Sequence, residues 1–157
     1  MKEKEPFMKE AIRLSEEKML AGFGGPFGAI VVRGEEIIAR GYNNVLSSND
    51  PTAHAEVDAI RKACQALDTY QLQDCELYTS CEPCPMCLGA IYWARLKKVY
   101  YGNTRQDAAA IGFDDNFIYD EITIPIDKRH IPMQQLLPQE AKTAFKAWQE
   151  KENKQNY

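Results

Sequence analysis

Hydrophobic and polar positions alternate along the chain with periods that separate helices from strands. Residues 5–22 carry apolar side chains at helical spacing between Glu and Lys, which predicts an amphipathic surface helix. Residues 27–32 form a short apolar run rich in β-branched side chains, which is typical of a buried strand. The turn residues 33–35 and the run 36–42 then predict the second strand of a hairpin.

The middle of the chain predicts helices and strands in alternation. A polar loop over residues 43–49 precedes Asp50-Pro51-Thr52, where a capping aspartate and a first-turn proline predict the start of a helix that runs to Leu67. The elements expected after it are a strand over 75–79, a helix that Pro83 opens and that runs through Trp93, and a strand over 98–102.

The periodicity weakens beyond residue 103. This part of the chain predicts a short helix over 107–111, a loop over 112–120, irregular structure with one short strand over 121–137, and a terminal helix over 140–152. The order of the elements predicts an α/β fold, a three-layer α/β/α sandwich with a mixed sheet of about five strands.

The composition is that of one ordinary globular domain. With 157 residues, of which 45% are hydrophobic and 27% charged, the chain is long enough to bury a core, so we expect residues 1–157 to form a single domain. No apolar run reaches the roughly 20 residues that a membrane span requires. The first residues carry charges of both signs and lack the apolar segment of a signal peptide, which indicates a cytoplasmic protein with no membrane partner.

The net charge and the cysteine count limit which partners and which cysteine chemistry the chain can have. The net charge of −4 disfavours broad electrostatic attraction to nucleic acid, which needs clustered Lys and Arg against the phosphates. An odd count of 5 cysteines without an export signal favours thiols or metal ligands over a disulfide framework.

Two short segments bring together metal-binding residue types. His54-Ala55-Glu56 and Pro83-Cys84-Pro85-Met86-Cys87 follow the pattern H-x-E and P-C-x-x-C, which is the signature of zinc-dependent nucleobase deaminases. His54, Cys84 and Cys87 supply three nitrogen and sulfur ligands, so the fourth position of a tetrahedral zinc is left for water, as a catalytic site requires. Glu56 is the candidate proton carrier beside that position.

Two other metal sites compete with this interpretation. Cys81 could join the three ligands in a closed Cys₃His structural zinc site, but such a site gives no reason for Glu56. The spacing of Cys81, Cys84 and Cys87 also opens a ferredoxin-type iron–sulfur motif, which fails because no fourth Cys-Pro follows. Of the remaining candidates, Cys64 and Cys75 are expected to be thiols in the core, and His130 a solvated loop residue.

Longer segments around these ligands carry a family resemblance. Residues 50–56 and 81–87 enclose the ligands, and further matching segments are 24–29, 42–44, 78–82, 89–95 and 112–115. In these motifs, which cover about residues 7–120, the chain resembles the bacterial guanine deaminases of the cytidine deaminase-like superfamily. The zinc motif is specific for deamination, whereas the flanking segments are less specific for the base.

The resemblance implies a mechanism and a set of residues. It implies that His54, Cys84 and Cys87 hold one Zn²⁺ per subunit, and that Glu56 transfers protons while water replaces the 2-amino group of guanine. The products are xanthine and ammonia, as in purine salvage or catabolism. At the purine base, the resemblance implies an amide contact from Asn43 and a hydrogen-bond acceptor from Asp115 rather than Asp114. It also implies that the rings of Phe27 and Trp93 stack on the two faces of the base, and that Tyr157 covers the pocket.

The resemblance also implies a homodimer in which residues 121–157 are exchanged with the partner subunit. Three other functions stay open at this point. They are a tRNA adenosine deaminase, which shares the zinc motif, a free cytosine deaminase, and a binding module that zinc stabilises without turnover.

Overall fold

The computed structural model describes residues 2–156, which divide into two compact units. The first unit extends to Asp115 and the second begins at Asn116. The elements of the first unit are η1 (Lys2–Lys4), α1 (Glu5–Leu20), β1 (Gly28–Arg33), β2 (Glu36–Tyr42), α2 (Val45–Ser48), α3 (Ala55–Leu67), β3 (Cys75–Cys81), α4 (Pro85–Trp93), β4 (Lys98–Asn103) and α5 (Arg105–Ala110). The second unit contains α6 (Asn116–Thr123), η2 (Ile126–Lys128) and α7 (Pro138–Glu150).

A mixed sheet forms the centre of the first unit. Its strand order is β2-β1-β3-β4, with β1 antiparallel to both neighbours and β3 parallel to β4. Helix α4 connects the two parallel strands, as such a crossover requires. The expected α/β fold class is confirmed, although the sheet has four strands among the described residues and not about five.

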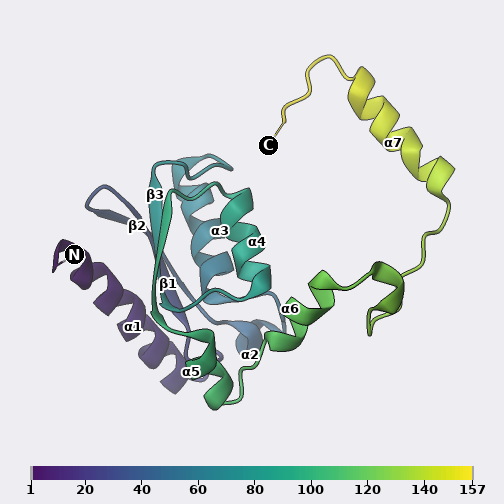
Figure 1. The fold of residues 1–157 in the computed structure, drawn as a ribbon. Helices are drawn as coiled ribbons and strands as arrows, with labels where there is room; N and C mark the ends of the chain where they lie inside the picture. The colour runs from purple at the N-terminus through teal and green to yellow at the C-terminus, as the bar shows by residue number, and fades with distance from the viewer. Residues whose placement is uncertain (1, 157) are drawn as a thin grey trace. The chain divides into compact units, whose positions relative to one another are not determined.

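Helices cover both faces of this sheet (Figure 1). Alternate residues of β1 point to opposite faces, so Val31 packs in the core under α3 while Ile30 and Val32 pack against α1. All three side chains are fully buried, which explains why this strand appears in the sequence as a continuous apolar run. The α3 side of the sheet also carries α4, because Ile91 and Ala94 belong to the same core cluster.

The two helices that carry the metal-binding motifs begin later than the sequence suggested. Helix α3 starts at Ala55, because Asp50 Oδ1 accepts hydrogen bonds from the backbone and hydroxyl of Thr52 and forms a local turn. Helix α4 starts at Pro85 and not at Pro83. These two shifts place His54 and Cys84 at the N-cap positions.

Two loop assignments were also wrong. The loop expected over 43–49 contains the short helix α2, and the loop expected over 112–120 contains the start of α6. Helix α6 and the 3₁₀ turn η2 occupy the region where a short strand was expected, and the described part of residues 116–157 contains no strand. The cause is an apolar 3.6-residue pattern in α6 that is too short to stand out in the sequence.

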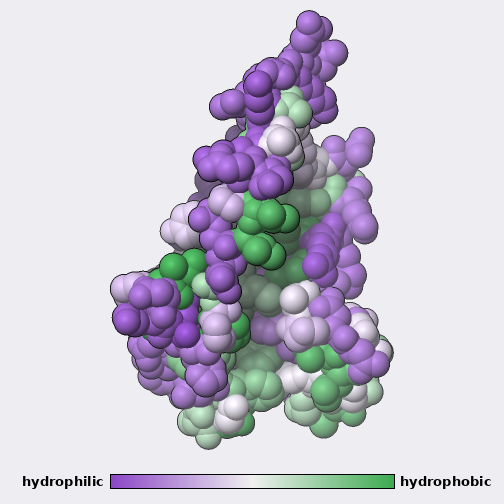
Figure 2. Space-filling view, turned by 90° about the vertical axis from the view of Figure 1, so that its right-hand side faces the viewer, coloured by the Kyte–Doolittle hydropathy of each residue, from purple (hydrophilic) through white to green (hydrophobic). Residues whose placement is uncertain are grey.

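The second unit has no interior of its own. None of the described residues from 116 to 156 is buried. Large apolar side chains of this unit, such as Phe117, Ile131, Leu136 and Phe145, are exposed. Figure 2 shows green, hydrophobic groups open to solvent among purple, hydrophilic ones on the face that it displays. Within residues 2–156, none of the helices combines the length and the apolar character that a membrane span requires.

Gly41 allows α3 to approach the sheet closely, which gives a test of the packing. A Cβ at Gly41 would lie 2.2 Å from the Ala55 carbonyl oxygen and 2.4 Å from the Ala59 nitrogen. Because both neighbours are backbone atoms, we expect Gly41→Ala to lower the free energy of unfolding in urea by about 1–3 kcal/mol. Gly89→Ala is the control, since nothing lies near that Cβ and alanine favours a helix interior by about 1 kcal/mol. Equal stability of Gly41→Ala and the wild type would contradict this packing.

Candidate active site

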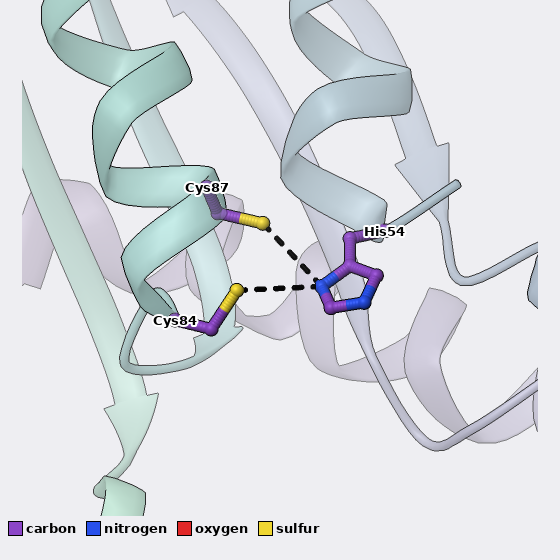
Figure 3. A group of neighbouring side chains, drawn as sticks. All are labelled: His54, Cys84 and Cys87. Carbon is purple, nitrogen blue, oxygen red and sulfur yellow. Dashed lines mark hydrogen bonds between the residues drawn. The ribbon is translucent and has the colours of Figure 1, made fainter. Parts of the chain in front are cut away.

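The predicted metal ligands meet where two helices begin on the same face of the sheet. His54 precedes α3 in extended conformation, Cys84 precedes α4, and Cys87 lies in the first turn of α4. Both sulfurs lie 3.5 Å from the Nδ1 atom of His54 and point toward it (Figure 3). The three possible ligand atoms all lie within 4.8 Å of one another.

This geometry fits zinc. Bonds of about 2.3 Å to sulfur and about 2.0 Å to nitrogen at a tetrahedral angle separate the two ligand atoms by about 3.5 Å. The two observed sulfur–nitrogen distances of 3.5 Å match that value. One imidazole and two cysteine sulfurs are also a donor set that zinc prefers, with Nδ1 as the nitrogen ligand and one tetrahedral position open.

Electrostatics at the helix start favour a thiolate. A hydrogen bond from the Cys87 thiol is the main cause that lowers the pKa of Cys84, to about 4, and His54 lowers it further. The hydrogen bond with Cys84 in turn raises the pKa of His54. The hydrogen bond between the two cysteines, together with burial, raises the pKa of Cys87. A divalent cation between these groups would take the place of their shared protons, so metal binding and proton release are linked.

Glu56 lies beside the ligands in a buried position. It belongs to the first turn of α3, and only 6% of its surface is exposed. Burial is the main cause that raises the pKa of this carboxyl group. Its Oε1 accepts a hydrogen bond of 3.1 Å from the Thr79 hydroxyl, and the Cys87 thiol donates to its Oε2 over 3.5 Å.

Thr79 is a neighbour of the site that sequence reasoning missed. It lies on β3 two residues after Leu77, whose side chain packs in the core under α3. Because alternate residues of a strand share a face, the pattern of β3 already directs Thr79 toward α3. A hydroxyl at a position where the pattern favours an apolar side chain was the available signal.

Cys81 and the other candidate thiols lie outside the ligand group. The Cys81 sulfur donates to the Thr104 carbonyl oxygen over 3.6 Å, and burial raises the pKa of Cys81 to about 11. Cys75 is buried and Cys64 half-buried, both as free thiols. His130 is exposed, and its backbone N–H donates to Glu121. The Cys₃His arrangement is therefore not formed among the described residues.

The Asn43 amide has a fixed direction. Its Oδ1 accepts hydrogen bonds from the backbone N–H groups of Gly25 and Val45, at 3.2 and 3.3 Å. This pairing assigns the oxygen to that side of the amide and places Nδ2, which can only donate, on the other side. Gly24 is required beside it, because a Cβ there would lie 2.1 Å from Asn43 Oδ1. The buried Asn43 side chain therefore joins the loop after β2 to the Gly25 backbone.

Aromatic and acidic residues follow at the end of the first unit. The Phe27 ring meets the Phe113 ring edge-to-face, with centroids 5.0 Å apart. Asp115 is half-buried, whereas Asp114 is exposed. Burial is the main cause that raises the pKa of Asp115, and the negative charge of Cys84 raises it further. The carboxyl group of Asp115 therefore interacts electrostatically with one of the candidate metal ligands.

Trp93 lies at the end of α4 that is away from Cys84. It is the last residue of α4, nine positions after Cys84, which corresponds to about 13 Å along a helix axis. Its side chain is 67% exposed. The Phe27 ring packs against the Phe113 ring, and the sandwich of a base between Phe27 and Trp93 stays a prediction. Tyr157, the expected cover of the pocket, lies outside the described residues.

Comparison with known proteins identifies the family. A model of the zinc-binding region of cytidine and deoxycytidylate deaminases matches residues 1–103. The chain belongs to this deaminase family. Family membership and the His/Cys/Cys group together support zinc as the metal.

Individual relatives separate into two groups. The chain is 59% identical to a guanine deaminase from Bacillus subtilis over 98% of both chains, and a crystal structure of guanine deaminase from that organism superposes with a TM-score of 0.95. A guanine deaminase structure from Nitrosomonas europaea gives 36% identity and a TM-score of 0.65 over 69% of this chain and 63% of that one. A tRNA-specific adenosine deaminase from Aquifex aeolicus is 45% identical over 62% of this chain and 64% of its own.

The ligand geometry predicts which cysteines hold the metal. We expect Cys87→Ser to lose zinc during dialysis, because two ligands cannot retain an ion that needs three protein donors. Cys81→Ala should keep the zinc content of the wild type, since its sulfur faces Thr104. Metal analysis by mass spectrometry on the dialysed proteins measures both. Loss of zinc from Cys81→Ala would instead indicate a closed structural site.

Proposed function

We propose that this chain hydrolyses guanine to xanthine and ammonia with one zinc ion per subunit. The observation that carries this proposal is the similarity to a guanine deaminase along nearly the whole chain, at 59% identity. Similarity to the tRNA adenosine deaminase covers only 62% of the chain, so the zinc core is shared while the rest of the chain follows the guanine enzymes.

The metal ligands and Glu56 have distinct roles in this proposal. His54, Cys84 and Cys87 would hold the ion, which when bound acts as a Lewis acid that lowers the pKa of a water molecule to about 7. Glu56 takes one proton from the attacking water and delivers it to a ring nitrogen, and then takes the second proton from the new hydroxyl at C2 and delivers it to the amine, which departs as ammonia. A buried carboxyl group with a raised pKa suits transfers in both directions.

Base selection is assigned to a donor and an acceptor on different elements. Guanine carries the O6 acceptor next to the N1–H donor. Asn43 Nδ2 is the donor for the oxygen, because its Oδ1 is already bound by the backbone. Asp115 is the acceptor for N1–H, as the more buried of the two aspartates. Phe27, packed against Phe113, supplies an apolar wall for the planar ring.

The proposed assembly is a cytoplasmic homodimer that exchanges residues 121–157. Two apolar surfaces support it. Residues 116–156 have no buried side chain, and α4 is apolar but exposes Leu88, Tyr92 and Trp93. A helix that is apolar all round is normally covered. The free thiols of the described cysteines agree with a reducing compartment.

A panel of substrates tests the reaction and the base together. We expect ammonia release from guanine to exceed that from adenine, cytosine and a tRNA anticodon stem-loop. 2,6-Diaminopurine should be a poor substrate, because its 6-amino group presents a donor to the Asn43 donor. Glu56→Gln should keep its zinc and lose about 10²–10⁴-fold in kcat. Preference for the stem-loop would overturn the proposal in favour of a tRNA deaminase, and undiminished turnover by Glu56→Gln would exclude the proposed proton transfer.

Mixed dimers test the exchange of the C-terminal segment. Glu56→Gln and Tyr157→Ala should each be inactive when alone. If Tyr157 covers the partner's site, random reassociation of the two variants gives mixed dimers with one complete site, which restores about a quarter of wild-type activity. A Tyr157 that covers its own subunit's site predicts no recovery. Sedimentation analysis of the mixture confirms that dimers form.

A further inference from the structure

Glu56 is held by one oxygen only. The Thr79 hydroxyl donates to Oε1 at 3.1 Å, whereas Oε2 lies 3.5 Å from the sulfur of Cys87, one of the metal ligands. The two oxygens of the carboxylate therefore have different environments. One is bound to the sheet and the other faces the ligand group.

From this division we infer that Thr79 is a positioning residue, which holds Oε1 so that Oε2 is directed to the reacting water and base. The inference rests on the proposed function. The Thr79 hydroxyl is the side-chain oxygen donor to Glu56 among the described residues.

Thr79 is itself fixed more firmly than most side chains. It lies in the middle of the sheet, paired with Ala29 on β1 and with Tyr101 on β4, and it is fully buried. Its β-branched side chain has few accessible rotamers. A flexible Glu side chain loses its rotational freedom when it is bound to such a group, which is what accurate proton transfer requires.

A hydroxyl at this position is costly unless it has a partner. The neighbouring inward residue, Leu77, is apolar and packs in the core under α3. Valine has nearly the shape of threonine and would fill the same space without a buried polar group. The carboxylate of Glu56 is the partner of the Thr79 hydroxyl, so the polar residue stabilises one side-chain orientation at the site.

Paired substitutions at position 79 test the inference. Thr79→Val removes the hydroxyl and keeps the shape, so we expect kcat per bound zinc to fall about ten- to hundredfold while KM changes little. Thr79→Ser restores the hydroxyl and should recover kcat to within about threefold of the wild type. A merely structural role for Thr79 predicts no such split between kcat and KM and no rescue by serine.

Ser80→Ala is the matched control. The Ser80 hydroxyl is also buried on β3, but it accepts the Gly28 N–H at 3.0 Å and points to the opposite face of the sheet. Loss of this hydrogen bond should lower the melting temperature and leave kcat per zinc unchanged. An equal loss of kcat in Ser80→Ala and Thr79→Val would overturn the specific role of Thr79.

Crystal structures of the zinc-loaded wild type and Thr79→Val decide the question without reference to a substrate. We expect the Glu56 carboxylate to leave its wild-type orientation in Thr79→Val. An unchanged carboxylate, or Thr79→Ser as slow as Thr79→Val, overturns the inference. Absence of ammonia release from guanine by the wild type would refute the proposed function alone, because the comparison of the two crystal structures would still report on Thr79.

Discussion

Two helix N-termini meet on one face of the sheet, and the rest of the site depends on this meeting. The residues at both N-caps are metal-ligand types, His54 and Cys84, and neither side chain makes a capping hydrogen bond. A good N-cap residue stabilises a helix by about 1 kcal/mol, so each helix gives up that contribution. In return the exposed N–H groups and the positive ends of both helices face the thiolate of Cys84. A metal that binds these side chains would join α3 to α4.

The sheet keeps both helix ends at the required distance. Gly41 lets α3 settle directly on β2, and the parallel crossover from β3 to β4 fixes α4 beside it. Thr79 on β3 reaches Glu56 on α3 across this interface. On the opposite face, Phe7 of α1 packs against Tyr78 of β3, and this cluster contains none of the proposed ligands and serves the fold. On the α3 face, β3 thus supplies Leu77 to the core and Thr79 to the site.

Local patterns predicted the chemistry better than the boundaries of the elements. The spacing of His54, Cys84 and Cys87 was sufficient to group the ligands, because each motif lies within about one helical turn. The helix starts were wrong by two to five residues, since Asp50 and Pro83 suit a turn as well as they suit a cap. The role of Thr79 and the fixed orientation of the Asn43 amide depend on contacts between distant segments, which periodicity does not encode.

The backbone bonds to Asn43 also restrict how the site can change. An exposed amide turns over by half a rotation, exchanges its oxygen for its nitrogen, and so accepts or donates as the ligand requires. Two backbone N–H groups hold the amide against that rotation here, and Gly24 makes room for the oxygen, because a Cβ at Gly24 would lie 2.1 Å from it. The path of the main chain therefore decides which side of the Asn43 amide carries the donor and which the acceptor. Under the proposed function, a new base preference at this contact would require a different residue at position 43, since the present one has no second orientation to offer.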